Sequence, residues 1–212
     1  MNGRIEEESE RIVRLGRSLF DRSLTFGRAG NLSTRVDETI VVTPTGVSLG
    51  ALDRHALSLI DLHGRHVGGA KPSKEAFLHA AVYRTRPEAG AVVHLHSTHA
   101  VAVSCLYDVN PADAIPPLTA YFVMRVGTLP ILPYHAPGDD RLEAAVADVA
   151  ARHRAFLIAN HGSVVSGTDL DAASDAAEEL EETARLFLLL RGLATRPLDP
   201  DQVAELRLRF PG

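Results

Sequence analysis

Apolar residues recur at helical spacing near the start of the chain. Ile12, Leu15 and Leu19 fall on one face of a helix, and acidic residues precede them, so the pattern predicts a helix over 5–23. Similar periodicity, bounded by capping residues and by Pro or Gly stops, predicts the other helices. They are expected at 73–84, 98–106, 139–152 and 169–191, with a short last helix from residue 200.

Short runs rich in β-branched and aromatic residues, bounded by polar turns, predict the strands. They are expected at 31–35, 39–43, 58–61, 66–67, 90–96, 120–125, 129–132 and 155–160. Strands and helices are mixed along the chain without strict alternation, which favours an α/β fold with a sheet covered by helices on both faces. Because the chain has 212 residues and neither a linker nor a repeat, we expect a single domain over 1–212. Dinucleotide-binding and P-loop glycine motifs are absent from the sequence.

Composition narrows the classes of function. The net charge is −5 and long basic runs are absent, so nucleic acid is a poor candidate partner. The most apolar stretch, 184–190, is far short of the roughly 20 residues that span a bilayer, and the polar N-terminus lacks the apolar core of a signal peptide. A single cysteine, Cys105, excludes a disulfide framework, and we expect a cytoplasmic protein without a membrane partner. Ten histidines, against two methionines and no tryptophan, direct attention to histidine chemistry.

Two histidines share one face of a predicted strand. His94 and His96 stand at positions i and i+2, which point to the same side of a strand and can share one metal ion. His161 follows the apolar run 156–159, where a buried strand ends at the edge of the sheet. Three histidines leave the fourth position of zinc open, which is the catalytic arrangement. The plainer alternatives are a hydrogen-bonded histidine pair on a half-buried strand and a histidine in a turn.

The start of the predicted helix 73–84 is a candidate anion site. Glu75 lies in its first turn, where free backbone N–H groups and the helix dipole favour negative charge. This carboxylate either stabilises the helix start or faces a metal while Ser73 and Lys74 bind a phosphate. Two small polar loops also offer backbone N–H groups to an anion, or simply turn the chain; they lie at 30–31 and 45–46.

Together these landmarks resemble those of the class II aldolase/adducin family, whose type member is the zinc-dependent fuculose-phosphate aldolase. They occur in the family's order between the first helix and Arg191, at 30–33, 43–46, 73–75, 94–96 and 161–162. The resemblance implies a three-layer sandwich around a mainly antiparallel sheet. It also implies that His94, His96 and His161 bind Zn2+, with Mn2+ or Co2+ as substitutes. Glu75 would ligate the resting metal and then act as acid and base.

The resemblance further implies a phosphate site for a small phosphorylated substrate. Its positions in this chain are Asn31, Thr45, Gly46 and Ser73. Lys74 stands where the fuculose-phosphate aldolase has a second serine, so the anion site of this chain is not identical to that of the aldolase.

The family's quaternary structure places one more residue at the site. A tyrosine from a neighbouring subunit serves as proton donor in the family, and it aligns on Tyr121; the alternative is a core aromatic of the predicted strand 120–125. Homotetramers with sites between subunits are therefore implied. His99, close to the histidine pair in the sequence, is a candidate to orient a metal ligand.

Within the family, the chain is most similar to the 3-oxo-tetronate 4-phosphate decarboxylases. The segments that carry this similarity are 71–75, 94–97, 121–139 and 179–184. The similarity implies zinc-dependent decarboxylation to dihydroxyacetone phosphate and CO2 through a metal-stabilised enediolate. The same site residues also suit a fuculose-phosphate-type aldolase, a pentulose-phosphate 4-epimerase or a metal-dependent dehydratase. A non-catalytic, adducin-like binding module is the alternative of another class.

Overall fold

The chain folds into elements close to those that its pattern predicts. The computed structural model describes residues 3–210. Its helices are α1 (Gly3–Asp21), α2 (Ala76–Thr85), α3 (Thr98–Ser104), α4 (Ala120–Arg125), α5 (Leu142–Ala150), α6 (Leu170–Leu190) and α7 (Pro200–Arg209). Its strands are β1 (Asn31–Val36), β2 (Thr39–Val42), β3 (Ser58–Asp61), β4 (His66–Gly69), β5 (Ala91–Leu95), β6 (Ile131–Leu132), β7 (Ala155–Ile158) and β8 (Gly162–Gly167). Two short 3-10 turns, Leu49–Ala51 and Arg54–Ala56, lie between β2 and β3.

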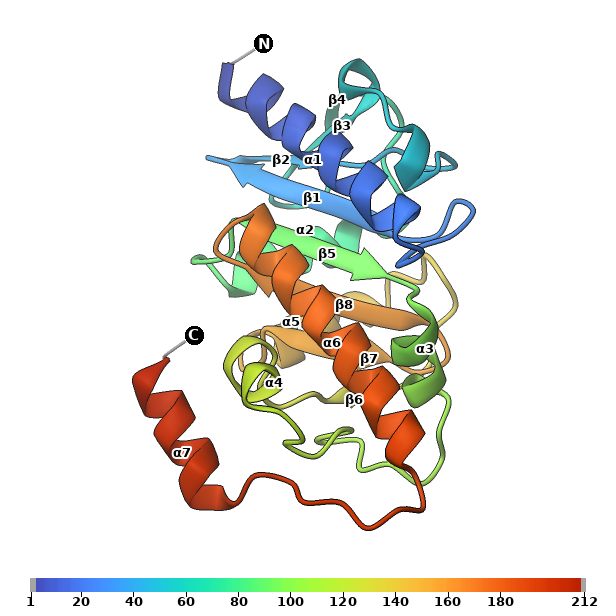
Figure 1. The fold of residues 1–212 in the computed structure, drawn as a ribbon. Helices are drawn as coiled ribbons and strands as arrows, with labels where there is room; N and C mark the ends of the chain where they lie inside the picture. The colour runs from blue at the N-terminus through green and yellow to red at the C-terminus, as the bar shows by residue number, and fades with distance from the viewer. Residues whose placement is uncertain (1–2, 211–212) are drawn as a thin grey trace.

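One sheet joins these strands in the order β4-β3-β2-β1-β5-β8-β7-β6 (Figure 1). Neighbouring strands are antiparallel except β6 and β7, which are parallel. The predicted α/β sandwich around a mainly antiparallel sheet is therefore confirmed. β5 lies at the centre of the sheet, which places its C-terminal end, and the histidines there, deep in the fold.

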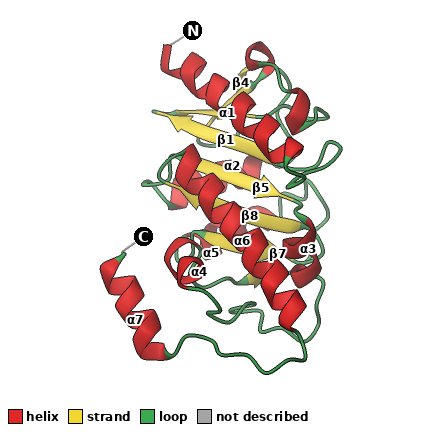
Figure 2. Ribbon diagram, viewed as in Figure 1, coloured by secondary structure: helices red, strands yellow, loops and turns green. Residues whose placement is uncertain are grey.

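Helices cover both faces of this sheet because apolar residues alternate along its strands. Val93 of β5 joins a core cluster with α1, α3, α4 and α6, whereas Val92 joins a second cluster with α2 and α5. Successive side chains of a strand point to opposite faces, so His94 lies on the same face as Val92, under α2. Figure 2 shows α1 and α6 running across the front of the sheet.

Two sequence predictions were wrong. Residues 120–125 form helix α4 instead of a strand: the Thr119 hydroxyl accepts from the Phe122 N–H at 3.1 Å and caps the helix, and Phe122 is buried while Tyr121 is 58% exposed. Tertiary packing of Phe122 overrides the β propensity of the segment.

β8 was not predicted, because its sequence of small and polar residues lacks alternation, although it pairs with both β5 and β7.

The C-terminal helix α7 begins as predicted, at Asp199 and Pro200. The Asp199 carboxylate accepts from the Gln202 N–H at 2.9 Å, and the Gln202 side chain accepts from the Asp199 N–H at 3.0 Å, which completes a capping box. The helix stands beside α4 and away from the sheet (Figure 1).

Among residues 3–210, no helix has the length and hydropathy needed to span a membrane.

Candidate metal centre

Four side chains converge at the C-terminal end of β5. Their potential ligand atoms, from Glu75, His94, His96 and His161, all lie within 4.8 Å of one another. His94 belongs to β5, His96 directly follows it, His161 lies between β7 and β8, and Glu75 precedes the first turn of α2. The structure thus brings together the four residues that the resemblance implies as ligands.

A tight connection between β7 and β8 places His161 beside the histidine pair. Asn160 adopts a left-handed conformation at φ 55°, which reverses the chain, and an added Cβ at Gly162 would meet the Leu95 carbonyl oxygen at 2.4 Å. Only glycine therefore allows β8 to approach β5 this closely. The His161 ring centroid lies 5.1 Å from that of His94 and 4.7 Å from that of His96.

The Glu75 carboxylate closes the cluster from the helix side. Its Oε1 lies 2.9 Å from His161 Nε2, and its Oε2 lies 3.3 Å from His94 Nε2. Burial opposes ionisation, but the adjacent His94 and His161 hold the pKa of Glu75 well below its usual range. Burial, together with the neighbouring His94 and His161, lowers the pKa of His96 to about 3. A carboxylate and a neutral imidazole are the forms that bind metals.

The orientation of the imidazoles fits a divalent cation. His94 Nδ1 donates to the Ser163 carbonyl oxygen at 2.7 Å, so the neutral imidazole carries its lone pair on Nε2, the nitrogen that faces Glu75 and His96. His161 is buried, and within residues 3–210 neither of its ring nitrogens makes a well-aligned hydrogen bond. Four tetrahedral ligand atoms about 2.1 Å from one ion lie roughly 3.4 Å apart. The 3.0 Å between His94 Nε2 and His96 Nε2 is close to this spacing.

Two of the segments expected to bind phosphate lie side by side: the loop at 45–46 and the residues just before α2. Pro44 and Pro72 form an isolated antiparallel bridge, the Thr45 N–H donates to the Lys71 carbonyl at 3.0 Å, and the Ser73 N–H donates to the Thr43 carbonyl at 3.2 Å. This pairing sets the residues of one loop, 45–46, against those of the other, 73–74, at the start of α2.

The tips of both loops are open to an incoming anion. Gly46 adopts a positive φ of 75°, and an added Cβ there would meet nothing within 4 Å among the described residues. Lys74 is exposed, and the Glu75 that follows it is buried in the histidine cluster. An anion between these loops would therefore lie next to the candidate metal ligands.

Asn31 is directed toward the cluster. Its Nδ2 donates to Glu75 Oε2 at 2.8 Å, and its Oδ1 accepts from His79. Both ends of the amide are therefore engaged with protein groups, and a phosphate contact from this residue stays a prediction.

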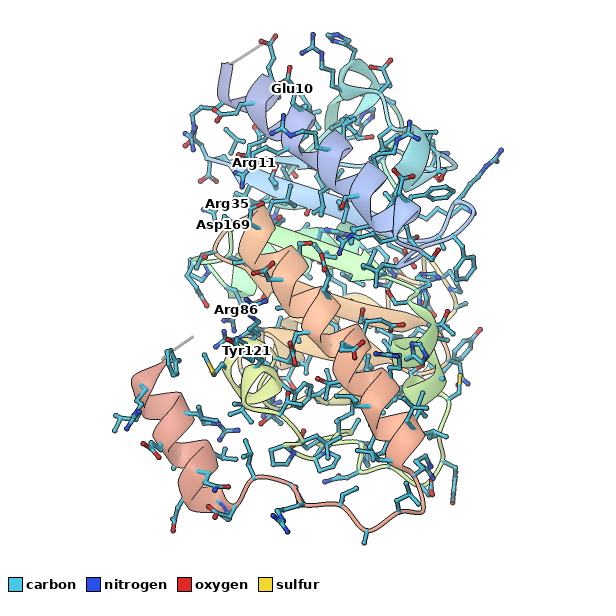
Figure 3. The ribbon with its side chains drawn as sticks, viewed as in Figure 1. Glu10, Arg11, Arg35, Arg86, Tyr121 and Asp169 are labelled. Carbon is cyan, nitrogen blue, oxygen red and sulfur yellow. The ribbon has the colours of Figure 1, made fainter. Side chains whose placement is uncertain are left out.

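Tyr121 does not lie at the cluster of its own chain. It is 58% exposed on α4, with the Arg125 guanidinium 5.6 Å from its ring centroid, so the alternative of a core aromatic is wrong. Figure 3 labels it on the side of the molecule away from α3, the helix that begins just after His96. A role of Tyr121 as proton donor at the site of a neighbouring subunit stays a prediction.

Sequence reasoning missed two buried polar residues near the cluster. Glu181 of α6 accepts from the N–H groups of His99 and Ala100 at 2.9 and 2.8 Å and from His99 Nδ1 at 2.8 Å, and so anchors α3 directly after His96. His99 thus bonds to Glu181, and a role in orienting a metal ligand stays a prediction. An acidic residue on the apolar face of the helix 169–191 was the available signal for Glu181. His79, on the buried face of α2, was left without a role.

Comparison with known proteins agrees with this geometry. Residues 10–188 match the family described as class II aldolase and adducin N-terminal domain. A 3-oxo-tetronate 4-phosphate decarboxylase of Haemophilus influenzae is 49% identical over 95% of this chain and 97% of its own. An L-fuculose phosphate aldolase of the same organism is 35% identical over 96% of this chain and 94% of its own. The crystal structure of YgbL from Klebsiella pneumoniae superposes with a TM-score of 0.93 at 48% identity, covering 96% of this chain and 99% of that one. This chain therefore belongs to the class II aldolase and adducin family.

Proposed function

We propose that the protein decarboxylates a 3-oxo-tetronate 4-phosphate and releases CO2 and dihydroxyacetone phosphate. The observation that carries the proposal is the cluster of Glu75 and three histidines beside two paired, anion-compatible loops. The relatives favour decarboxylation over aldol cleavage, because the decarboxylase of Haemophilus influenzae is 49% identical and the aldolase 35%.

The substrate's phosphate would be held by the paired loops. Backbone N–H groups around Gly46, the hydroxyls of Thr45 and Ser73 and the Lys74 ammonium offer the donors and the charge that a phosphate needs. Asn31 is the remaining residue of the predicted phosphate site. Bound in this way, the substrate would extend its oxo acid toward the histidine cluster.

The reaction breaks the bond between the carboxylate carbon and C2. CO2 departs, and the bonding electrons move through C2 to the C3 oxygen, which leaves an enediolate. A divalent cation held by His94, His96 and His161, which we take to be Zn2+ with Mn2+ or Co2+ as substitutes, would supply the Lewis acid that stabilises this negative oxygen. C2 then takes a proton to give dihydroxyacetone phosphate.

Two residues are candidates to deliver that proton. Glu75 lies at the cluster, but its lowered pKa keeps it ionised in the resting site, so it must first take up a proton before it can donate one. Tyr121 of a neighbouring copy is the other donor. Because Tyr121 lies apart from the cluster of its own chain, we propose a homotetramer with sites between subunits. We further propose that residues 1–212 act as one domain, in the cytoplasm.

Product analysis tests the function. The purified protein, with its metal content measured on the same sample, is expected to release CO2 and dihydroxyacetone phosphate from a synthesised 3-oxo-tetronate 4-phosphate. Release of an aldehyde from a ketulose phosphate, without CO2 from the oxo acid, would establish the aldolase instead. Interconversion of pentulose phosphates would establish the epimerase. Purified protein that binds no metal and turns over none of these compounds would favour the alternative of a non-catalytic, adducin-like binding module.

Lys74→Met is expected to raise KM about 10- to 100-fold with kcat little changed. A charge-assisted contact to the non-reacting phosphate contributes about 1.5–3 kcal/mol equally to the bound ground state and the transition state. Steady-state CO2 release measures both constants. Lys71→Met is the matched control, since this exposed lysine lies in the same loop. A KM equal to that of the unaltered protein would remove Lys74 from the phosphate site.

A further inference from the structure

A chain of hydrogen bonds runs from the candidate metal centre into the core beneath α2. Glu75 Oε2 accepts from Asn31 Nδ2, and Asn31 Oδ1 contacts His79 Nε2. His79 Nδ1 lies 2.7 Å from Ser33 Oγ, which lies 2.8 Å from the Tyr83 hydroxyl. All five residues are buried, and His79 and Ser33 have no exposed surface. The chain connects two turns of α2 with β1.

Only one arrangement of protons satisfies all the hydrogen bonds between Glu75 and Tyr83. An ionised carboxylate can only accept, so the Asn31 amide must turn its NH2 group to Glu75 and its oxygen to His79. His79 Nε2 must then carry the hydrogen. Because His79 is neutral, its Nδ1 is an acceptor, and the Ser33 hydroxyl donates to it while accepting from Tyr83.

His79 is held in the neutral form by its surroundings. Burial, aided by the nearby His94, lowers the pKa of His79 to about 3, and burial raises the pKa of Tyr83 above its usual value. Both groups therefore keep these protonation states across the neutral range. Every hydrogen bond from Tyr83 onward therefore donates in the direction of Glu75, and the last one ends on the Glu75 carboxylate.

We infer that His79 is a positioning residue for Glu75, acting through the Asn31 amide. Without the Nε2–H group, the Asn31 oxygen would be buried with no donor, which costs free energy and favours a rotation of the amide that brings its oxygen to another donor. Such a rotation moves Nδ2 away from Glu75 and releases Oε2. The histidine thus determines where the carboxylate points, although its ring nitrogens bond to Ser33 and Asn31 and reach Glu75 only through the Asn31 amide.

The inference goes beyond the proposed function but rests on it for its kinetic readout. A second readout, the affinity for Co2+ alone, reports on Glu75 as a metal ligand without any substrate. If the decarboxylase assay fails, the Co2+ titration still decides the role of His79, so the two failures are distinguishable.

Three variants separate positioning from simple packing. His79→Leu keeps an apolar volume of similar size but removes both hydrogen bonds. His79→Gln restores them, since its NH2 group can reach the position of Nε2 and its oxygen can accept from Ser33. Tyr83→Phe removes the far end of the chain, where Ser33 can still donate to His79. If His79 acted only through packing, the effect of each variant would follow the buried contacts that it loses. His79→Gln would then have no advantage over His79→Leu.

His79→Leu is expected to lower both kcat and Co2+ affinity about 10- to 100-fold, the usual effect of losing a group that orients a metal ligand, with KM unchanged. His79→Gln should recover both to within about threefold, and Tyr83→Phe should change neither by more than that. In a Glu75→Gln background, His79→Leu should have no further effect on either, because coupled residues are non-additive.

The same measurements can overturn the inference. It is overturned by a His79→Leu protein with the kcat and Co2+ affinity of the parent, by an undiminished effect in the Glu75→Gln background, or by a Tyr83→Phe protein that loses as much. If His79→Leu does not fold, Ser33→Ala replaces it, because it removes the group that bonds His79 Nδ1. A loss of Co2+ affinity with Ser33→Ala that vanishes in the Glu75→Gln background supports the inference, and unchanged affinity overturns it.

Discussion

His96→Ala is expected to abolish metal binding and activity together. The His96 ring lies beside both His94 and His161, with its Nε2 3.0 Å from that of His94, so its loss leaves two histidines and one carboxylate in the cluster. Stabilisation of the developing oxyanion by a bound cation contributes several kcal/mol, and we therefore expect kcat/KM to fall on the order of 10³-fold or more. Fold stability without metal should change little, because His96 is only partly buried.

Metal content and CO2 release, measured on the same preparation, check this expectation. The protein is dialysed against Zn2+, freed of excess ion and analysed for bound metal. His63→Ala is the matched control, since His63 is exposed in the turn between β3 and β4 and lies in no part of the cluster. An alanine variant that keeps full activity without bound metal would overturn the proposed site as a whole.

Parts of the candidate metal cluster could be predicted from the sequence because their geometry is local. His94 and His96 need only the two-residue spacing of a strand, and the strand before His161 is marked by the apolar run 156–159. That these pieces meet was not visible in any single motif. It follows from the pairing of β8 with β5, and β8 was the strand that the pattern failed to reveal.

The remaining errors and omissions are tertiary in origin. The segment 120–125 has the composition of a strand, but a cap at Thr119 and the burial of Phe122 make it helical. Likewise, no spacing rule connects Asn31 with His79, which are distant along the chain and meet because α2 packs on β1. Residues that act by supporting others, such as Glu181 under α3, have no motif of their own.

Glu75→Gln is expected to keep the metal but to lose turnover. Glutamine is nearly isosteric, and its carbonyl oxygen can still accept from Asn31 Nδ2, where Glu75 Oε2 now accepts at 2.8 Å. Three histidines remain, which is the ligand set of many catalytic zinc sites. The amide cannot take up and return a proton, and loss of a positioned acid–base group lowers rates by about 10²- to 10⁴-fold. We expect kcat to fall by this factor while KM stays nearly unchanged.

The choice of conditions makes this result specific to Glu75. In the unaltered protein Glu75 Oε1 lies 2.9 Å from His161 Nε2, and in the variant the NH2 group of the glutamine takes the place of this oxygen. Because this change will weaken metal binding, the kinetics are measured at a saturating metal concentration and the bound metal is quantified. Glu7→Gln, at an exposed position of α1, controls for the change of charge. Turnover equal to that of the unaltered protein would exclude Glu75 as acid or base and leave Tyr121 as the proton donor. A fall in kcat with bound metal retained would separate proton transfer at Glu75 from metal binding by the three histidines.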